Sequence, residues 1–195
     1  LVVSSQPAWP PSSGGRNRIY NTLKFTSVSC DTHVLCPYEP GAVEALIAIG
    51  VSPHFFSRSV LYLCGLLDEV FRRLRFPSFY FSWLSNPFVF LNVLFVIGRT
   101  RPKVIHCIDS SLALYTVIAS KLTRVRHVLT KFDVEYFGAF REKRLLNIDY
   151  AEASLSLLKM MELHVCNNSE IVVTPSEVDK ETLRRMGVRS LIRVI

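Results

Sequence analysis

Hydrophobic and polar positions follow two alternating periods along this chain. Short apolar runs of strand character are followed by longer stretches in which apolar residues recur every three or four positions, as on one face of a helix. Strands are expected near residues 1–5, 32–36, 53–57, 103–108, 127–131, 170–174 and 190–195. Helices are expected near residues 16–27, 41–49, 59–74, 87–99, 110–122, 141–165 and 176–186. This alternation predicts an α/β fold, with a Rossmann-like, mostly parallel sheet and helices on both faces.

The clearest strand-to-helix unit runs from Val104 to Ser120. Its apolar strand pattern ends in Asp109 and Ser110, and a helical apolar pattern begins at once. The acid and the serine are therefore expected where a parallel strand gives way to a helix. In open α/β sheets ligands bind beyond this edge, so both residues are candidate binding residues.

A glycine loop follows the first predicted strand. It comprises Ser12-Ser-Gly-Gly-Arg16 and directly precedes a predicted helix. Gly14 and Gly15 let the backbone approach a ligand closely, and the first amides of a helix can bind an anion. The loop lacks the Lys-Ser/Thr pair of a P-loop, so a simple turn is the alternative interpretation.

A third candidate lies at the end of the strand expected near residues 127–131. Asp133 and Glu135 stand two residues apart, close to Lys131. Two carboxylates beside a lysine could position hydroxyl groups of a ligand or take part in acid–base chemistry. The alternative is a solvated loop in which Asp133 caps the next turn.

In their order and spacing, these segments resemble the N-terminal domain of glycosyltransferase family four, the retaining enzymes of the GT-B fold. The matching segments are residues 12–16, 18–24, 104–109, 128–135, 162–176, 183–188 and 192–195. The resemblance covers nearly the whole chain. It implies one N-terminal domain, residues 1–195, that holds the acceptor and forms one wall of the cleft.

The resemblance also implies a second, donor-binding domain that this sequence does not contain. In the family the nucleotide sugar is bound chiefly by a C-terminal domain, through an acidic motif absent from this sequence, so the chain alone is expected to transfer no sugar. A retaining, hexosyltransferase-like enzyme is expected when that domain is present. The competing hypothesis is a non-catalytic subunit that binds an acceptor or a membrane and pairs with a separate donor-binding chain.

The resemblance assigns roles to the candidate residues. The backbone amides of the glycine loop are expected near the donor diphosphate, with a cationic side chain as charge partner, and the acids and the serine are expected to contact acceptor or sugar. The predicted substrate-binding residues are Gly14, Gly15, Arg16, Asp109, Ser110 and Lys131, and the predicted catalytic residues are Asp133 and Glu135. Phe132 stands where the family usually has a histidine that contacts the donor sugar.

Composition and net charge limit the classes of partner that we expect this chain to bind. With 195 residues, 49% of them hydrophobic, the chain can bury one sizeable core, and 20% charged residues are too many for a polytopic membrane protein. The formal net charge of +7 favours anionic partners, here nucleoside diphosphates or acidic lipid head groups. The only hint of a nucleic-acid face is the basic cluster Arg72 to Arg75 with nearby phenylalanines, so no nucleic acid is expected.

The cysteines and histidines suggest neither a metal nor a cofactor. The five cysteines are widely spaced and form no CxxC pair, which favours a reducing cytosol over a disulfide framework or a zinc site. His106 is expected to be a hydrogen-bonded core residue. The resembled family generally needs no bound metal, and the nucleotide sugar is its substrate. The chain begins inside a strand-like run without a basic region before it, so we expect a fragment without a visible signal peptide.

The aromatic-rich stretch from Phe76 to Ile97 admits two interpretations. Asn86-Pro87 reads as the start of a helix and divides the stretch, so a bilayer span is not expected. It could form a helix buried against the sheet. Alternatively, residues 79–83 and the arginines at 72, 73 and 75 could form an interfacial patch on an anionic membrane, as lipid-linked acceptors are common in the resembled family.

Overall fold

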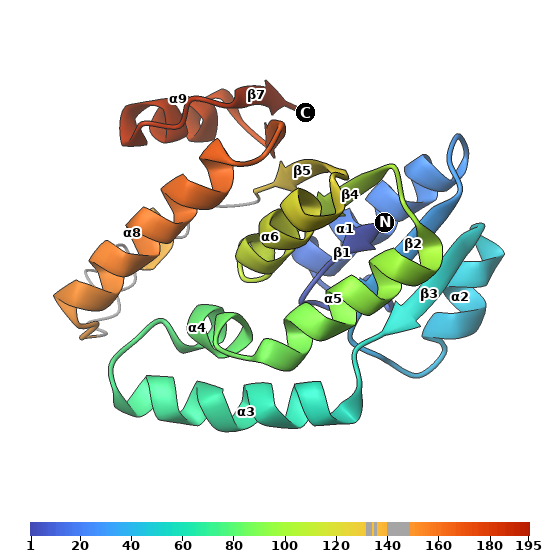
Figure 1. The fold of residues 1–195 in the computed structure, drawn as a ribbon, viewed down its shortest axis with the longest axis horizontal. Helices are drawn as coiled ribbons and strands as arrows, with labels where there is room; N and C mark the ends of the chain where they lie inside the picture. Colours follow the sequence, from blue (N-terminus) through green and yellow to red (C-terminus); the bar gives the residue numbers. More distant parts are fainter. Residues whose placement is uncertain (132–133, 135, 140–148) are drawn as a thin grey trace.

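The computed structural model describes residues 1–131, 134, 136–139 and 149–195 (Figure 1). Within them, seven parallel strands form one sheet in the order β3-β2-β1-β4-β5-β6-β7. The strands are β1 (Val2–Val3), β2 (Thr32–Cys36), β3 (Val51–Phe55), β4 (Val104–Cys107), β5 (Arg126–Thr130), β6 (Ile171–Thr174) and β7 (Leu191–Val194). The helices are α1 (Gly14–Ser27), α2 (Ala42–Ala48), α3 (Arg58–Arg73), α4 (Ser78–Leu84), α5 (Pro87–Thr100), α6 (Ala113–Thr123), α8 (Glu152–Asn167) and α9 (Glu177–Met186). The expected Rossmann-like α/β fold is confirmed.

The strand order reverses at β1. Val2 of β1 lies opposite Val34 of β2 on one side and opposite His106 of β4 on the other. From β1 the chain builds outward to β3 first and then returns to add β4 to β7 on the opposite side. The carboxyl ends of β1 and β4 therefore mark the topological switch point, where sheets of this kind bind ligands.

Two buried clusters show that helices cover both faces of the sheet. Val2 and Val34 belong to one cluster together with residues of α1 and α2. The next residue along each strand, Val3 and Leu35, belongs to the other cluster, together with residues of α5, α6, α8 and α9. This division follows from the period of two along a strand, which sends successive side chains to opposite faces.

Helices α1 and α5 begin at capping side chains, of which Asn86 was expected from the sequence. The Ser13 hydroxyl accepts a hydrogen bond from the Arg16 amide at 3.3 Å, so α1 begins at Gly14. Asn86 caps α5 by accepting from the Phe88 amide at 3.1 Å, with Pro87 at the first helical position. By contrast, the helix expected from residue 110 begins only at Ala113. The segment expected as a helix at 141–165 begins its described part at Glu152.

The aromatic stretch contains a helix that the sequence did not predict, and this helix is buried. Tyr80, Phe81 and Trp83 of α4 are only 6%, 3% and 6% exposed. Phe81 packs against Phe71 and Phe76, with ring centroids 5.7 and 5.0 Å apart. The expectation that residues 79–83 form an interfacial patch is therefore wrong for these three side chains, because they face the core.

All five cysteines are free thiols, and four of them are buried. Among the residues that the structure describes, no helix has the length and apolar character needed to cross a bilayer.

Candidate functional site

Asp109 joins the ends of β1 and β4 at the switch point. Its Oδ2 accepts hydrogen bonds from the Ser5 amide at 2.7 Å and the Ser5 hydroxyl at 2.6 Å. Its Oδ1 accepts from the Ser111 amide at 3.0 Å and the Ser111 hydroxyl at 2.5 Å. Asp109 thus lies at the expected edge of the sheet, but its carboxylate primarily organises two loops. Its predicted contact with a ligand stays a prediction.

Ser110 and Lys131, both predicted from the sequence, are brought together next to this point. The Lys131 ammonium donates to the Ser110 hydroxyl at 2.5 Å. It also forms an ion pair with Glu162 Oε1 at 2.5 Å, and the side chains of Lys131 and Glu162 are 1% and 0% exposed. Because the ammonium is buried and paired, its predicted direct contact with a diphosphate stays a prediction.

Glu162 contacts Lys131 and Tyr136, the residues directly before and after the segment 132–135 that contains the predicted catalytic residues. One oxygen pairs with Lys131, which precedes this segment, and the other accepts from the Tyr136 amide, which follows it, at 3.1 Å. The predicted catalytic residues Asp133 and Glu135 lie outside the described residues, as does Phe132. Glu162 was not predicted as a site residue. Its position on the buried side of α8, one turn after Leu158, was the available signal.

The two glycines of the glycine loop have different surroundings. A side chain on Gly15 would meet the Gln6 side-chain oxygen at 2.7 Å, whereas nothing lies within 4 Å of such a position on Gly14. Gly15 therefore permits close packing of Gln6 against the start of α1. Arg16 forms an ion pair with Glu39 at 3.3 Å, and both side chains remain partly exposed. The first turn of α1 contains no acidic residue, so its amides keep a positive potential suited to an anion.

A groove of about 440 Å³ opens beside α1. One wall is a single face of α1, with side chains at positions 18, 21, 22 and 25, and the other includes Thr130, Thr174 and Pro175 at the carboxyl ends of β5 and β6. Thr130 directly precedes Lys131 in the sequence. Its lining mixes hydroxyl, amide, guanidinium and apolar groups, which suits a ligand with both polar and apolar parts.

His106 is hydrogen-bonded, as predicted, but it is only partly buried and lies outside the buried clusters of the core. Its Nε2 lies 2.7 Å from the Thr130 hydroxyl, and burial lowers its pKa to about 4. His127 lies between the hydroxyls of Thr116 and Ser169, at 2.9 and 3.0 Å, and burial also lowers its pKa to about 4. Both imidazoles are therefore neutral near pH 7 and supply hydrogen bonds rather than charge.

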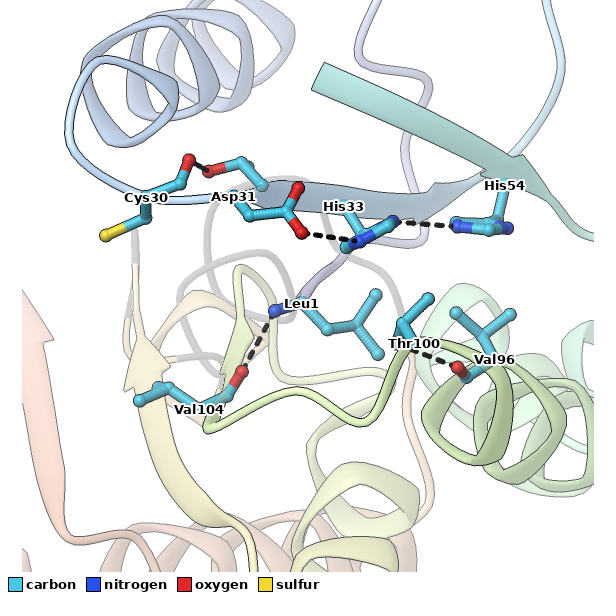
Figure 2. Close-up of polar contacts among 9 residues, drawn as sticks. Leu1, Cys30, Asp31, His33, His54, Val96, Thr100 and Val104 are labelled. Carbon is cyan, nitrogen blue, oxygen red and sulfur yellow. Dashed lines mark hydrogen bonds and ion pairs between the residues drawn. The ribbon is translucent and has the colours of Figure 1, made fainter. Parts of the chain in front are cut away.

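A further polar cluster gathers around the first residues of β2 and β4. Figure 2 shows His33 between Asp31 and His54, with His33 Nδ1 and His54 Nε2 separated by 3.2 Å. Burial, and then the neighbouring His33 and Arg99, lower the pKa of His54. Within the described ranges, no group of three or more histidine, cysteine or acidic residues could hold a metal ion. The cluster lies at the edge opposite the switch point and takes no part in the candidate site.

Comparisons with known proteins agree with this arrangement. The model of Glycosyltransferase Family 4 matches residues 14–195. A comparison with curated protein sequences finds no match.

Solved structures show the same fold. HepE of Anabaena, crystallised in complex with UDP and glucose, is similar with a TM-score of 0.62 and 13% identity over 100% of this chain and 43% of its own. Sucrose-phosphate synthase from Thermosynechococcus elongatus gives a TM-score of 0.57 and 13% identity over 100% and 47%. The lipopolysaccharide outer core galactosyltransferase WaaB gives 0.52 and 13% over 99% and 44%. The chain thus spans less than half the length of these proteins.

Proposed function

We propose, from the premise that this chain belongs to glycosyltransferase family 4, that it is the acceptor-side N-terminal domain of a retaining sugar transferase. The full enzyme would move a sugar from a nucleotide donor to a lipid, glycan or small-molecule acceptor. The observation that carries this proposal is the family match over residues 14–195, in a chain whose Asp109, Ser110 and Lys131 follow the carboxyl ends of two neighbouring parallel strands.

The glycine loop is the proposed contact with the donor diphosphate. Transfer breaks the bond between the sugar and the diphosphate, and the leaving diphosphate takes up negative charge. Backbone amides at the start of α1 would stabilise that charge, with Arg16 as a nearby cation. HepE binds UDP and glucose, which supports a nucleotide-sugar donor for this chain as well.

The groove beside α1 is the proposed site for part of the acceptor. Its mixed lining extends to Thr130, one residue before Lys131 and close in sequence to the proposed catalytic residues Asp133 and Glu135. In this proposal Asp109 and Ser110, which follow the neighbouring strand β4, contact the acceptor or the sugar. The ion pair between Lys131 and Glu162 fixes the residue that directly precedes the segment 132–135.

Transfer assays with the given chain and with the protein from the complete reading frame test this proposal. Each is incubated with labelled nucleotide sugars and a membrane extract as acceptor source. We expect transfer by the complete protein and none by residues 1–195 alone. Transfer by residues 1–195 would show that no second domain is required. Acceptor binding without nucleotide binding or transfer by the complete protein would favour the non-catalytic subunit.

A further inference from the structure

Helix α3 exposes a continuous apolar stripe. Large apolar side chains recur at every fourth position along it, so they lie on one side of the helix. They are Tyr62, Leu66, Val70 and Leu74, with exposed fractions of 71%, 50%, 50% and 56%. The opposite side of α3 already contributes Val60 and Cys64 to the core. A helix that packs with one face normally presents polar residues to solvent, so this second stripe needs a partner.

Helix α5 carries a second stripe of the same kind. Phe88, Leu91 and Phe95 are 50%, 55% and 69% exposed, while Val89 and Val93 of the same helix are fully buried. Figure 1 shows α3 along one boundary of the molecule, with α5 next inward in that view. The two helices are tied at their N-terminal ends, because the Asn86 side chain that caps α5 donates to the Val60 carbonyl of α3 at 2.9 Å.

The segment that carries both stripes also accounts for most of the chain's net positive charge. Residues 58–103 contain seven basic and two acidic side chains, a surplus of five in a chain whose formal net charge is +7. Both acids, Asp68 and Glu69, already pair with Arg72 or Arg73 on α3. The remaining basic residues are Arg58, Arg75, Arg99, Arg101 and Lys103, and of these only Arg75 has an ion pair, with Asp149, among the residues that the structure describes.

Apolar stripes combined with unpaired arginine and lysine fit an anionic lipid surface. An interfacial helix buries its apolar face at the boundary of head groups and acyl chains, while basic residues contact the lipid phosphates. A second copy of this chain would instead bring two surfaces of net positive charge face to face, and like charges across an interface cost free energy. The excess of positive charge around these stripes therefore favours a membrane over a second copy of this chain.

We propose that the outer faces of α3 and α5, the α3–α5 surface, dock this protein on anionic membranes. Tyr62, Leu66 and Phe95 insert between the head groups, and Arg58 and Arg99 contact lipid phosphates. This surface replaces the buried aromatic residues of α4 as the membrane contact. The proposal does not depend on sugar transfer, since a binding subunit would dock in the same way.

Co-sedimentation with vesicles tests the α3–α5 surface. The full-length protein is mixed with vesicles of phosphatidylcholine and phosphatidylglycerol in equal parts, or of phosphatidylcholine alone. We expect binding to the mixed vesicles that weakens with salt, and much less binding to phosphatidylcholine. The double variant Leu66→Ser/Phe95→Ser and the double variant Arg58→Glu/Arg99→Glu should both bind more weakly, the latter on the order of fivefold or more for each charge removed.

Matched variants elsewhere on the surface control for a general loss of charge or hydrophobicity. Ile47 and Val178 are 59% and 76% exposed on α2 and α9, and Arg189 is exposed near β7. Ile47→Ser/Val178→Ser and Arg189→Glu should leave vesicle binding unchanged, and circular dichroism checks the fold of each variant.

Three outcomes would overturn the proposal. The wild-type protein could fail to bind the mixed vesicles, or control and surface variants could bind equally. Leu66→Ser/Phe95→Ser could instead abolish a dimer seen by light scattering without changing vesicle binding, which would identify an interface between copies. The assay contains no sugar donor, so none of these results bears on the proposed transferase activity.

Discussion

Ser5 and Asp109 lie 104 positions apart in the sequence and are joined at the carboxyl edge of the sheet by two hydrogen bonds to one carboxylate oxygen. The bonds come from the Ser5 amide at 2.7 Å and the Ser5 hydroxyl at 2.6 Å. Hydrogen bonds to an ionised acceptor are stronger than those between neutral groups. The loops after β1 and β4 therefore share one anchor next to the glycine loop.

Asp109→Asn should destabilise the domain even without any ligand. An amide nitrogen cannot accept a hydrogen bond, so two of the four donors on Ser5 and Ser111 lose their partner. We expect a loss of about 1–3 kcal/mol in the free energy of unfolding, measured by urea denaturation. Ser5→Ala removes only the hydroxyl bond and should cost less, about 1 kcal/mol. Unchanged stability of Asp109→Asn would mean that this carboxylate is free for a ligand rather than structural.

The buried pair of Lys131 and Glu162 gives a sharper test. Glu162→Gln removes the carboxylate that pairs with the buried Lys131 ammonium, which should cost about 3–5 kcal/mol. Lys131→Met/Glu162→Leu removes both charges and should cost clearly less than the sum of the two single changes. Urea denaturation of the single and double variants measures this coupling. Additive losses would contradict the interpretation of the pair as one electrostatic unit.

The strand-and-helix pattern was predictable because it depends on local periodicity. All seven strands appear near their expected positions, His106 is hydrogen-bonded as expected, and the Asn86-Pro87 helix start behaves as the sequence indicates. Helix α4 was missed because its aromatic residues show no clear helical period, and only packing against Phe71 and Phe76 reveals which side is buried.

The polar site was only partly predictable for a different reason. The strand ends placed Asp109, Ser110 and Lys131 at one edge, since parallel strands share their carboxyl ends. No local pattern shows whether a charged side chain will be solvated or buried. The partner of Lys131 comes from α8, 31 positions away, and so depends on tertiary packing. The same holds for Ser5 as the partner of Asp109.

The two neutral histidines, His106 and His127, predict a pH-dependent stability. His106 and His127 have pKa values of about 4 in the folded protein, below the ordinary value of 6.5. Between pH 6.5 and 4 the unfolded chain therefore binds more protons than the folded one, so the free energy of unfolding falls as the pH falls through this window. Each histidine contributes on the order of 3 kcal/mol at most by the end of it.

Urea denaturation at pH 7, 6 and 5 checks this sign. Wild type should lose stability steadily toward pH 5, and His127→Gln should show a shallower slope although it is less stable at pH 7. His164→Gln, on the exposed side of α8, is the control and should keep the wild-type slope. A slope that is the same in wild type and His127→Gln would contradict a buried, neutral His127.

Substitutions at the two glycines of the loop before α1 distinguish a role in packing from a role in binding a ligand. A methyl group on Gly15 must displace the Gln6 side-chain oxygen, which lies 2.7 Å from its position, whereas one on Gly14 meets nothing within 4 Å. Gly14→Ala should therefore be neutral or stabilise the helix by up to about 1 kcal/mol. Gly15→Ala should be less stable than Gly14→Ala by roughly 1–2 kcal/mol, and Gln6→Ala should restore most of that difference.

Gly15→Val in the full-length protein then tests the proposed diphosphate contact. A β-branched side chain blocks close approach of a ligand to the backbone, so transfer should be abolished. Thermal denaturation must accompany the assay, because loss of folding would give the same result. The informative variant is Gly15→Val combined with Gln6→Ala, in which the clash with Gln6 is relieved. If that double variant unfolds near the wild-type temperature and transfers no sugar, the loop contacts the donor. Wild-type turnover in the double variant would show that Gly15 serves only to pack against Gln6.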